Sequence, residues 1–142
     1  MKPVISVFLI LMSGFWCMGM FTGCGGTATA PVDPGTEPPH EGTLVPLPDG
    51  KSWIEFVKKE SATPNDSELY VYFYQDDKYT HHDQMPESAI LAIDNKRQVT
   101  LKVIDDALVT PPGPVLFGKN EVRGELIFEL DGSKMNVPLG LR

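Results

Sequence analysis

One segment of the chain concentrates the side chains that bind metal ions: residues 74–84, "YQDDKYTHHDQ". Its candidate ligands are Asp76, Asp77, His81, His82 and Asp83. Neutral imidazoles and carboxylates bind zinc or copper, and carboxylates alone hold calcium. Neighbouring histidines point apart on a strand, so both could bind one ion only from an irregular loop. Because the spacing matches no established metal motif, a solvated hairpin loop is favoured over a metal site.

A second group is aromatic. Tyr70, Tyr72 and Tyr74 alternate along "ELYVYFYQ" (68–75), so on a strand they share one face. Exposed, they would form a strip suited to sugar or protein contact, since tyrosine combines apolar area with a polar tip. Covered, they would be part of a core, which is the favoured interpretation. Trp53, on the expected outer face of another strand, is a further candidate contact residue.

Catalytic machinery is not recognisable. The serines show no nucleophile elbow, and no glycine-rich loop could cradle a phosphate. The carboxylates sit singly on alternating strand positions, as on a solvated sheet. We therefore predict no enzymatic activity and no cofactor, with an unrecognised hydrolase as a remaining alternative.

Cys24 is the residue with the clearest expected chemistry. It follows a leader in which Lys2 supplies a positive start and residues 4–16 form an apolar run. Small residues, Thr22 and Gly23, then precede the cysteine, as in a secretory signal with its cleavage site. A retained anchor helix is less favoured because glycines interrupt the apolar run. We predict a signal peptide over residues 1–23.

The order Phe21-Thr22-Gly23-Cys24 resembles the lipobox of bacterial lipoprotein precursors. In that family the cysteine receives a diacylglycerol, the chain is cut before it, and the new amine is often acylated, for example with palmitate. The resemblance implies a membrane anchor at Cys24 and a mature chain without a thiol or disulfide, since Cys17 would be removed. Gly25 in place of aspartate implies the outer membrane, on its periplasmic side or at the cell surface, rather than the inner membrane.

Residues 24–42 are expected to form a lipidated cysteine followed by a tether. The segment is rich in proline and glycine and holds no large apolar side chain except Val32, so it cannot bury enough surface to order itself. His40 lies in this tether and could reach the metal-ligand segment only by folding back. The domain itself is expected over residues 43–142.

Seven short runs with period-two alternation follow, separated by turn residues. They are residues 43–47, 52–59, 68–75, 88–93, 98–104, 122–130 and 134–141. This pattern predicts an all-β, antiparallel β-sandwich of immunoglobulin-like kind, held without a disulfide. Residues 105–120 are long for an unstructured loop, so Val115, Leu116 and Phe117 are expected to dock on a sheet edge or form an eighth strand.

Inward faces can be assigned from the same alternation. Ile54 and Phe56 are expected to face inward, as are three sets from later runs: Leu69, Val71, Phe73; Val99, Leu101, Val103; and Leu126, Phe128, Leu130.

The runs "GTLVPLPDGKSWIEFV", "LYVYFYQDD" and "ELIFELDGSKMNVPL" together resemble small envelope lipoproteins of environmental bacteria. Many of those carry His-Gly-Gly at the start of the domain, where this chain has His40-Glu41-Gly42. The resemblance supports the expected fold and implies no catalytic residue.

Charge restricts the partners. The net charge of −7 repels nucleic acid and anionic headgroups. The leading hypothesis is a lipid-anchored module of the cell envelope that binds or scaffolds a protein or glycan. The alternative is a periplasmic metal-binding lipoprotein that uses residues 76–83.

Overall fold

The computed structural model describes residues 35, 37–94, 96–114, 116, 118 and 121–141. Apart from one turn of 3-10 helix, η1 (Pro64–Asp66), the regular structure is β-strand. The strands are β1 (Thr43–Pro46), β2 (Trp53–Lys59), β3 (Glu68–Tyr74), β4 (Ser88–Ile93), β5 (Arg97–Ile104), β6 (Ala107–Val109), β7 (Val122–Leu130) and β8 (Ser133–Leu141). All seven predicted strands are present, and β6 is an eighth within residues 105–120.

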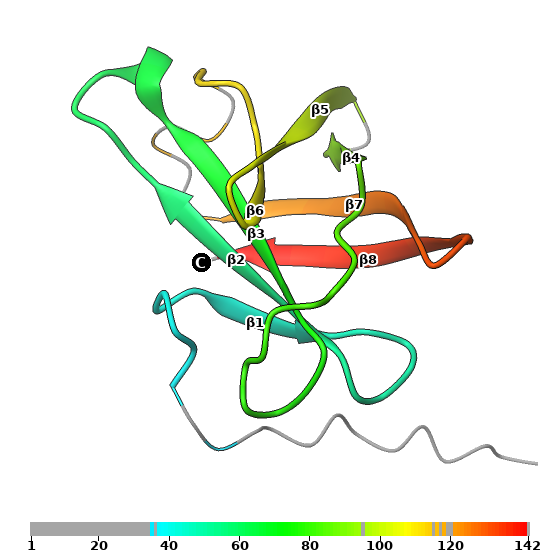
Figure 1. Cartoon of the computed structure of the whole chain (residues 1–142). Helices are drawn as coiled ribbons and strands as arrows, with labels where there is room; N and C mark the ends of the chain where they lie inside the picture. The colour runs from blue at the N-terminus through cyan, green and yellow to red at the C-terminus, as the bar shows by residue number, and fades with distance from the viewer. Residues whose placement is uncertain are drawn as a thin grey trace, which may run out of the picture.

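All eight strands belong to one antiparallel sheet with the order β1-β2-β3-β6-β5-β4-β7-β8 (Figure 1). The all-β antiparallel class is thus confirmed. The sheet curls until it is nearly closed, so the two packed layers expected of a sandwich are two parts of one continuous sheet. The hairpins β4–β5 and β5–β6 are inserted between β3 and β7, which accounts for the one departure from sequential order.

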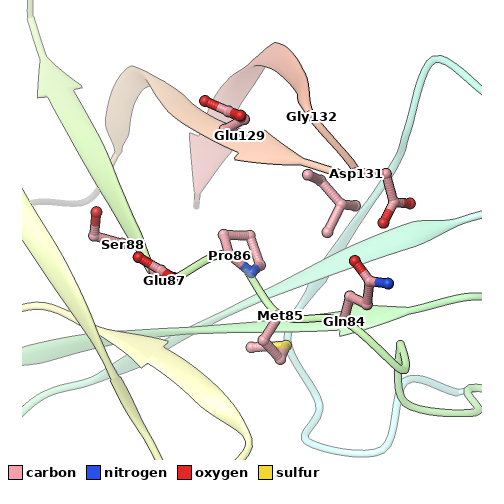
Figure 2. A pocket seen from close by; sticks show the side chains of 9 residues that line it. Gln84, Met85, Pro86, Glu87, Ser88, Glu129, Asp131 and Gly132 are labelled. Carbon is pink, nitrogen blue, oxygen red and sulfur yellow. The ribbon is translucent and has the colours of Figure 1, made fainter.

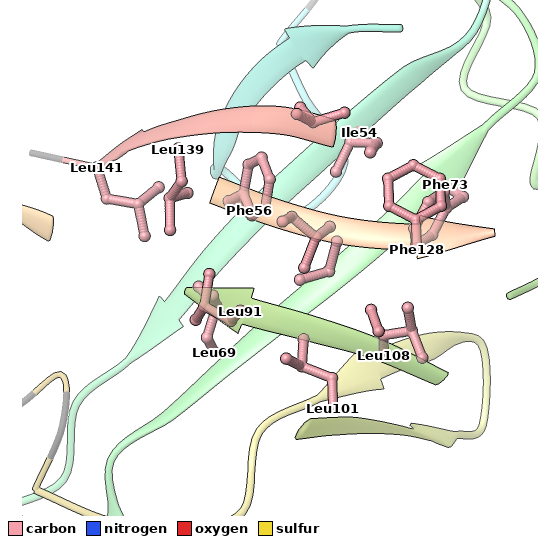
Figure 3. Close-up of a cluster of buried hydrophobic side chains, with 14 of the residues drawn as sticks. Ile54, Phe56, Leu69, Phe73, Leu91, Leu101, Leu108, Phe128, Leu139 and Leu141 are labelled. Atoms are coloured by element: carbon pink, nitrogen blue, oxygen red, sulfur yellow. The ribbon is translucent and has the colours of Figure 1, made fainter. Parts of the chain in front are cut away.

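The curled sheet encloses an apolar core, drawn in Figure 3. Most of the predicted inward residues are buried there: Ile54, Phe56, Leu69, Val71, Phe73, Leu101, Leu126, Phe128 and Leu130. Phe73 meets Phe128 edge to face, with ring centroids 5.2 Å apart. The alternation weakens at the end of β5, where Val103 remains 42 % exposed beside the turn into β6. The described residues contain no cysteine, so this core holds by packing alone.

The connection after β6 docks as predicted. The side-chain oxygen Oγ1 of Thr110 accepts a hydrogen bond from the backbone of Leu69 at 2.9 Å, and the N–H of Gly113 donates to the carbonyl of Ser67 at 3.1 Å. Leu116 is buried in the core. Val115 and Phe117, which we also expected to dock, lie outside the described residues.

Candidate functional site

The outer face of β2 and β3 carries a second buried cluster, separate from the core. It contains Trp53, Tyr72, Tyr74, Ala107 and Val109, with Tyr70 and Tyr79 partly buried beside them. Trp53 is only 8 % exposed, Tyr72 6 % and Tyr74 fully buried. Tyr70 is half-buried, and the ammonium of Lys59 lies 3.6 Å from its ring centroid. The predicted aromatic strip therefore exists, but it is covered at Tyr72 and Tyr74, as the favoured interpretation expected.

Residues 38–42, which we call the strap, cover part of this outer face. The strap turns on itself through a hydrogen bond from the N–H of Glu41 to the carbonyl of Pro38 at 3.1 Å. Gly42 lies so close to β2 that an added Cβ would be 2.6 Å from the carbonyl oxygen of Phe56. Only glycine fits this approach. A domain boundary at residue 43 thus leaves out a segment that the sheet binds.

Glu55 on β2 holds the strap in place. Its carboxylate is fully buried although it points away from the core. One carboxylate oxygen, Oε1, accepts hydrogen bonds from the backbone N–H groups of His40 at 3.0 Å and Gly42 at 2.8 Å. The other, Oε2, accepts one from the hydroxyl of Tyr74 at 2.7 Å and lies 3.1 Å from Nδ1 of His40. The buried charge is thus surrounded by donors, as a buried carboxylate must be.

The imidazole of His40 is fixed in both position and orientation. Its ring stacks on Tyr72, with centroids 3.8 Å apart and planes 8° from parallel. Nδ1 of His40 lies 3.1 Å from Oε2 of Glu55 and also 3.1 Å from the hydroxyl oxygen of Tyr74. Because the Tyr74 hydroxyl donates to Glu55 and an ionised carboxylate only accepts, this arrangement favours the tautomer of the neutral ring that carries its hydrogen on Nδ1. In the neutral ring the other nitrogen, Nε2, then keeps its lone pair. The side chain is 35 % exposed, so part of the imidazole is open to solvent.

The same carboxylate shapes the titration of its tyrosine neighbours. Burial, the hydrogen bond to Glu55 and the charge of Glu55 all raise the pKa of Tyr74 far above its ordinary value. Burial, followed by the charges of Asp106 and Glu55, raises the pKa of Tyr72 as well. Both hydroxyls therefore stay protonated at physiological pH, and Tyr74 remains a hydrogen-bond donor to Glu55.

The predicted metal ligands lie in a hydrogen-bonded turn after β3. His81 forms an isolated bridge with Tyr74, and the N–H of His82 donates to the carbonyl of Phe73 at 3.0 Å. Asp76 closes the turn by accepting backbone hydrogen bonds from Lys78 at 3.0 Å and Thr80 at 2.9 Å. The hydrogen bonds from Thr80 and then Lys78 lower the pKa of Asp76.

The structure does not gather these candidate ligands around one point. His81 faces Asp106 of the β5–β6 turn at 3.6 Å, and Nδ1 of His82 accepts a hydrogen bond from the backbone of Gln84 at 3.3 Å. Asp77 and Asp83 are exposed turn residues. Within the described ranges, no three histidine, cysteine, aspartate or glutamate side chains form a group that could enclose a metal ion.

Among the hollows on the surface of the described residues, one lies beside residues 84–88 and one beside the strap. The larger, about 570 Å³, lies between residues 84–88 and the β7–β8 turn, with the carboxylates of Glu87, Glu129 and Asp131 around it (Figure 2). The smaller, about 300 Å³, is lined by the strap and β2 together with Leu141 at the end of β8. His40 and Glu41 both lie on its rim.

Comparisons with protein-family models, with curated proteins and with solved structures found no match to this chain. The fold and the site alone define its class: an all-β protein whose nearly closed sheet binds an amino-terminal strap through a buried carboxylate. Among the described residues, no helix has the length and apolar character needed to cross a membrane. Cys24, the predicted lipid attachment point, lies outside the described residues.

Sequence reasoning missed the pair of His40 and Glu55. We placed His40 in the tether, and Glu55 was among the carboxylates that we expected on a solvated sheet. A signal was nevertheless present, because the neighbours of Glu55 on that face of β2 are Trp53 and Val57. An acidic residue between two large apolar residues on one strand face predicts a covered carboxylate with dedicated donors. The donors themselves come from a segment whose composition gave no sign of order.

Proposed function

We propose that this chain is a lipid-anchored, non-enzymatic module of the cell envelope that binds or scaffolds a protein or glycan. The observation that carries the proposal is the order of three segments: a secretory leader, a lipobox-like Phe21-Thr22-Gly23-Cys24, and a proline-rich tether leading into a folded domain. An acylated cysteine with two or more chains holds a protein firmly at a bilayer, whereas one chain binds only marginally.

The start of the folded domain is consistent with this arrangement. The strap is the last part of the predicted tether, and its backbone is bound by Glu55 on the outer face of the sheet. A tether that ends in a docked segment leaves the rest of the surface free for a partner. We infer the outer membrane, on its periplasmic side or at the cell surface, because Gly25 follows the cysteine.

A binding role is favoured over catalysis by the hydrogen bonds of Glu55, the one carboxylate that is buried among the described residues. Both oxygens of Glu55 are engaged by donors from the strap and from Tyr74, so this carboxylate is committed to holding structure. A general acid or base instead needs an oxygen within reach of a substrate proton.

The anchor is tested by mass analysis of the protein purified from its own host. The expected product begins at Cys24 and carries the mass of a diacylglycerol with or without a further acyl chain. In the Cys24→Ser variant the chain should lose the lipid and leave the membrane fraction. The Cys17→Ser variant is the matched control and should behave like the wild type. An unlipidated amino terminus, or cleavage at another residue, would overturn the proposal.

The binding role is tested by crosslinking in the host cell followed by mass spectrometry. Wild-type protein should give one reproducible envelope partner, and Cys24→Ala should lose that partner if anchoring brings the two together. A broad hydrolase substrate screen on the purified protein should return no activity. A turnover that is lost on a single side-chain substitution would favour the enzymatic alternative.

A further inference from the structure

The imidazole of His40 contacts three buried side chains on the outer face of the sheet. We propose that these three, Tyr72, Tyr74 and Glu55, form a binding site for an arginine side chain of a partner protein, and that this arginine displaces the His40 ring. The inference rests on the proposed binding role and names the chemistry of the partner. It does not depend on membrane attachment.

The first argument is the shape of the group that the site holds. The His40 ring lies flat on Tyr72, with the ring centroids 3.8 Å apart and the planes 8° from parallel. At the edge of the imidazole, Nδ1 lies 3.1 Å from Oε2 of Glu55 and 3.1 Å from the hydroxyl oxygen of Tyr74. The site therefore accommodates a planar group that carries a hydrogen-bond donor on its edge.

The second argument is that the site offers more acceptors than the imidazole can use. The Tyr74 hydroxyl donates its hydrogen to Oε2 of Glu55 at 2.7 Å and keeps lone pairs with which to accept. Two acceptor oxygens thus face Nδ1 of His40, which brings at most one hydrogen. A guanidinium group has two parallel N–H groups that match such a pair of oxygens, and it also stacks on aromatic rings. The ammonium group of lysine has no flat face with which to stack.

The third argument is charge. Glu55 is fully buried, and the chain as a whole carries a net charge of −7. After burial, the charges of Asp106 and Glu55 raise the pKa of Tyr72, so both carboxylates act on this ring. A cation over the ring face is attracted by the carboxylates and by the ring itself. The neighbouring tyrosine already has such a contact, because the ammonium of Lys59 lies 3.6 Å from the ring centroid of Tyr70.

The His40 ring can be displaced while the strap stays bound. The side chain is 35 % exposed, and His40 lines the hollow of about 300 Å³ beside the strap, which has space for the displaced ring. The backbone N–H groups of His40 and Gly42 bind the other oxygen of Glu55, Oε1, and do not depend on the ring. Lys58 lines the same hollow, but its ammonium is paired with Glu60.

The test uses isotope-labelled full-length chain in detergent micelles under reducing conditions. The probe is a blocked tripeptide, acetyl-Gly-Arg-Gly-amide, and nuclear magnetic resonance follows its binding. The His40 ring signals should lose the shift that stacking on Tyr72 imposes, whereas the Gly42 amide should stay protected from hydrogen exchange. His82, in the turn after β3, is the internal control and should not shift.

Two variants should change the affinity for this peptide in opposite directions. His40→Ala removes the internal competitor, so the affinity should rise about 5-fold or more. Glu55→Gln replaces a charged acceptor by a neutral one, so the affinity should fall about 10-fold. His82→Ala is the matched control and should bind as the unsubstituted chain does. Near-ultraviolet circular dichroism checks that each variant is folded.

Equal or weaker binding of the peptide by folded His40→Ala would overturn the proposal. Equal affinity for acetyl-Gly-Lys-Gly-amide would contradict it, because the site would then respond to charge alone. Displacement of the His40 ring by the neutral sugar cellotriose, but not by the arginine peptide, would assign the site to a glycan instead. If His40→Ala does not fold, the unsubstituted chain decides, and unchanged His40 signals at millimolar peptide concentrations would rule the site out.

This test and that of the proposed function fail independently. Crosslinking in the host cell detects an envelope partner whatever its chemistry, so a partner can be found even when the arginine peptide does not bind. Conversely, the peptide titration uses purified chain and needs neither an envelope partner nor the lipid at Cys24.

Discussion

Glu55 is a buried carboxylate on the face of the sheet that points away from the core. Burying an unpaired charge costs several kcal/mol, so the carboxylate requires the donors that the strap and Tyr74 supply. The strap in turn has few apolar side chains with which to hold itself on the sheet. The Glu55 carboxylate and the strap therefore stabilise each other. Displacing the strap should leave the carboxylate without its backbone donors, and replacing the carboxylate should release the strap.

Gly42 gives the sharpest test of that dependence. In the Gly42→Ala variant the new methyl group would lie 2.6 Å from the carbonyl oxygen of Phe56 and 2.7 Å from Cγ of Glu55. The strap must then move away from β2, and we expect a loss of about 1–3 kcal/mol in the free energy of unfolding. Urea denaturation measures it.

Gly140 provides a matched control for this substitution. An added Cβ at Gly140 on β8 would meet nothing within 4 Å. Gly140→Ala should therefore change the free energy of unfolding by no more than about 0.5 kcal/mol. Equal losses in the two variants would mean that the close approach of the strap to β2 is not what stabilises it.

Tyr74 predicts a loss of stability in alkali. Burial, followed by the hydrogen bond to Glu55, raises its pKa in the folded state, whereas the unfolded chain releases this proton near pH 10.0. The contribution is fully present below that pH and is lost as the pH rises above it. The Tyr74→Phe variant lacks this titrating group. Its free energy of unfolding should therefore fall less steeply with pH than that of the wild type, the two slopes differing by up to about 1.4 kcal/mol per pH unit.

Denaturation at about pH 9 and about pH 11 measures this difference between wild type and Tyr74→Phe. Tyr70 and Tyr72, whose pKa values are also raised, remain in both proteins and contribute equally. If the free energy of unfolding falls equally with pH in the two proteins, Tyr74 is not buried against a charged Glu55.

At the scale of the elements, β2 and β3 are central because each carries the core on one face and the candidate site on the other. Phe73 is fully buried and meets Phe128 across the core. The Phe73→Ala variant should lose about 3–5 kcal/mol of unfolding free energy. Ile90→Ala, at a position 40 % exposed on β4, is the control and should lose much less. A small effect at Phe73 would mean that the inward face of β3 is misassigned.

Most strands were predictable because two kinds of residue alternate along them, and β4, β5, β7 and β8 each have one wet face. Alternation identified β2, β3, β4, β5, β7 and β8, and the turn signal Asp131-Gly132 matches a two-residue hairpin in which both residues have positive φ, 52° and 73°. Closure into one sheet was not predictable, since it depends on the pairings β3–β6 and β4–β7 between distant segments. β6 has only three residues, and all are buried, so its sequence shows no alternation between apolar and polar positions.

The site was only half predictable. The tyrosine strip followed from period two, but its cover did not, because the strap is held by hydrogen bonds to its backbone rather than by an apolar pattern. Backbone donors are present in every sequence and leave no compositional trace.

At the scale of the whole molecule, the two ends of the sheet order are its weakest places. Within the described residues β1 pairs only with β2, and β8 only with β7. Each of these strands contains a proline, Pro46 and Pro138, as edge strands tolerate. In contrast, β3 and β4 are paired on both sides.

Amide hydrogen exchange should reveal this gradient. The amides of β1 should exchange faster than those of β3 and β4, because local opening of an edge strand breaks fewer contacts. Mass spectrometry of exchanged, digested protein resolves these segments. Protection of β1 equal to that of β3 would indicate that the sheet is fully closed in solution.

The strap determines where a pulling force on the domain would act first. A pulling force on the residues that precede the strap would act first on the hydrogen bonds of Glu55 and only then on β1. Those hydrogen bonds lie on the face of the sheet opposite the core. A pull on the residues before the strap would therefore act on these hydrogen bonds before it acts on the core.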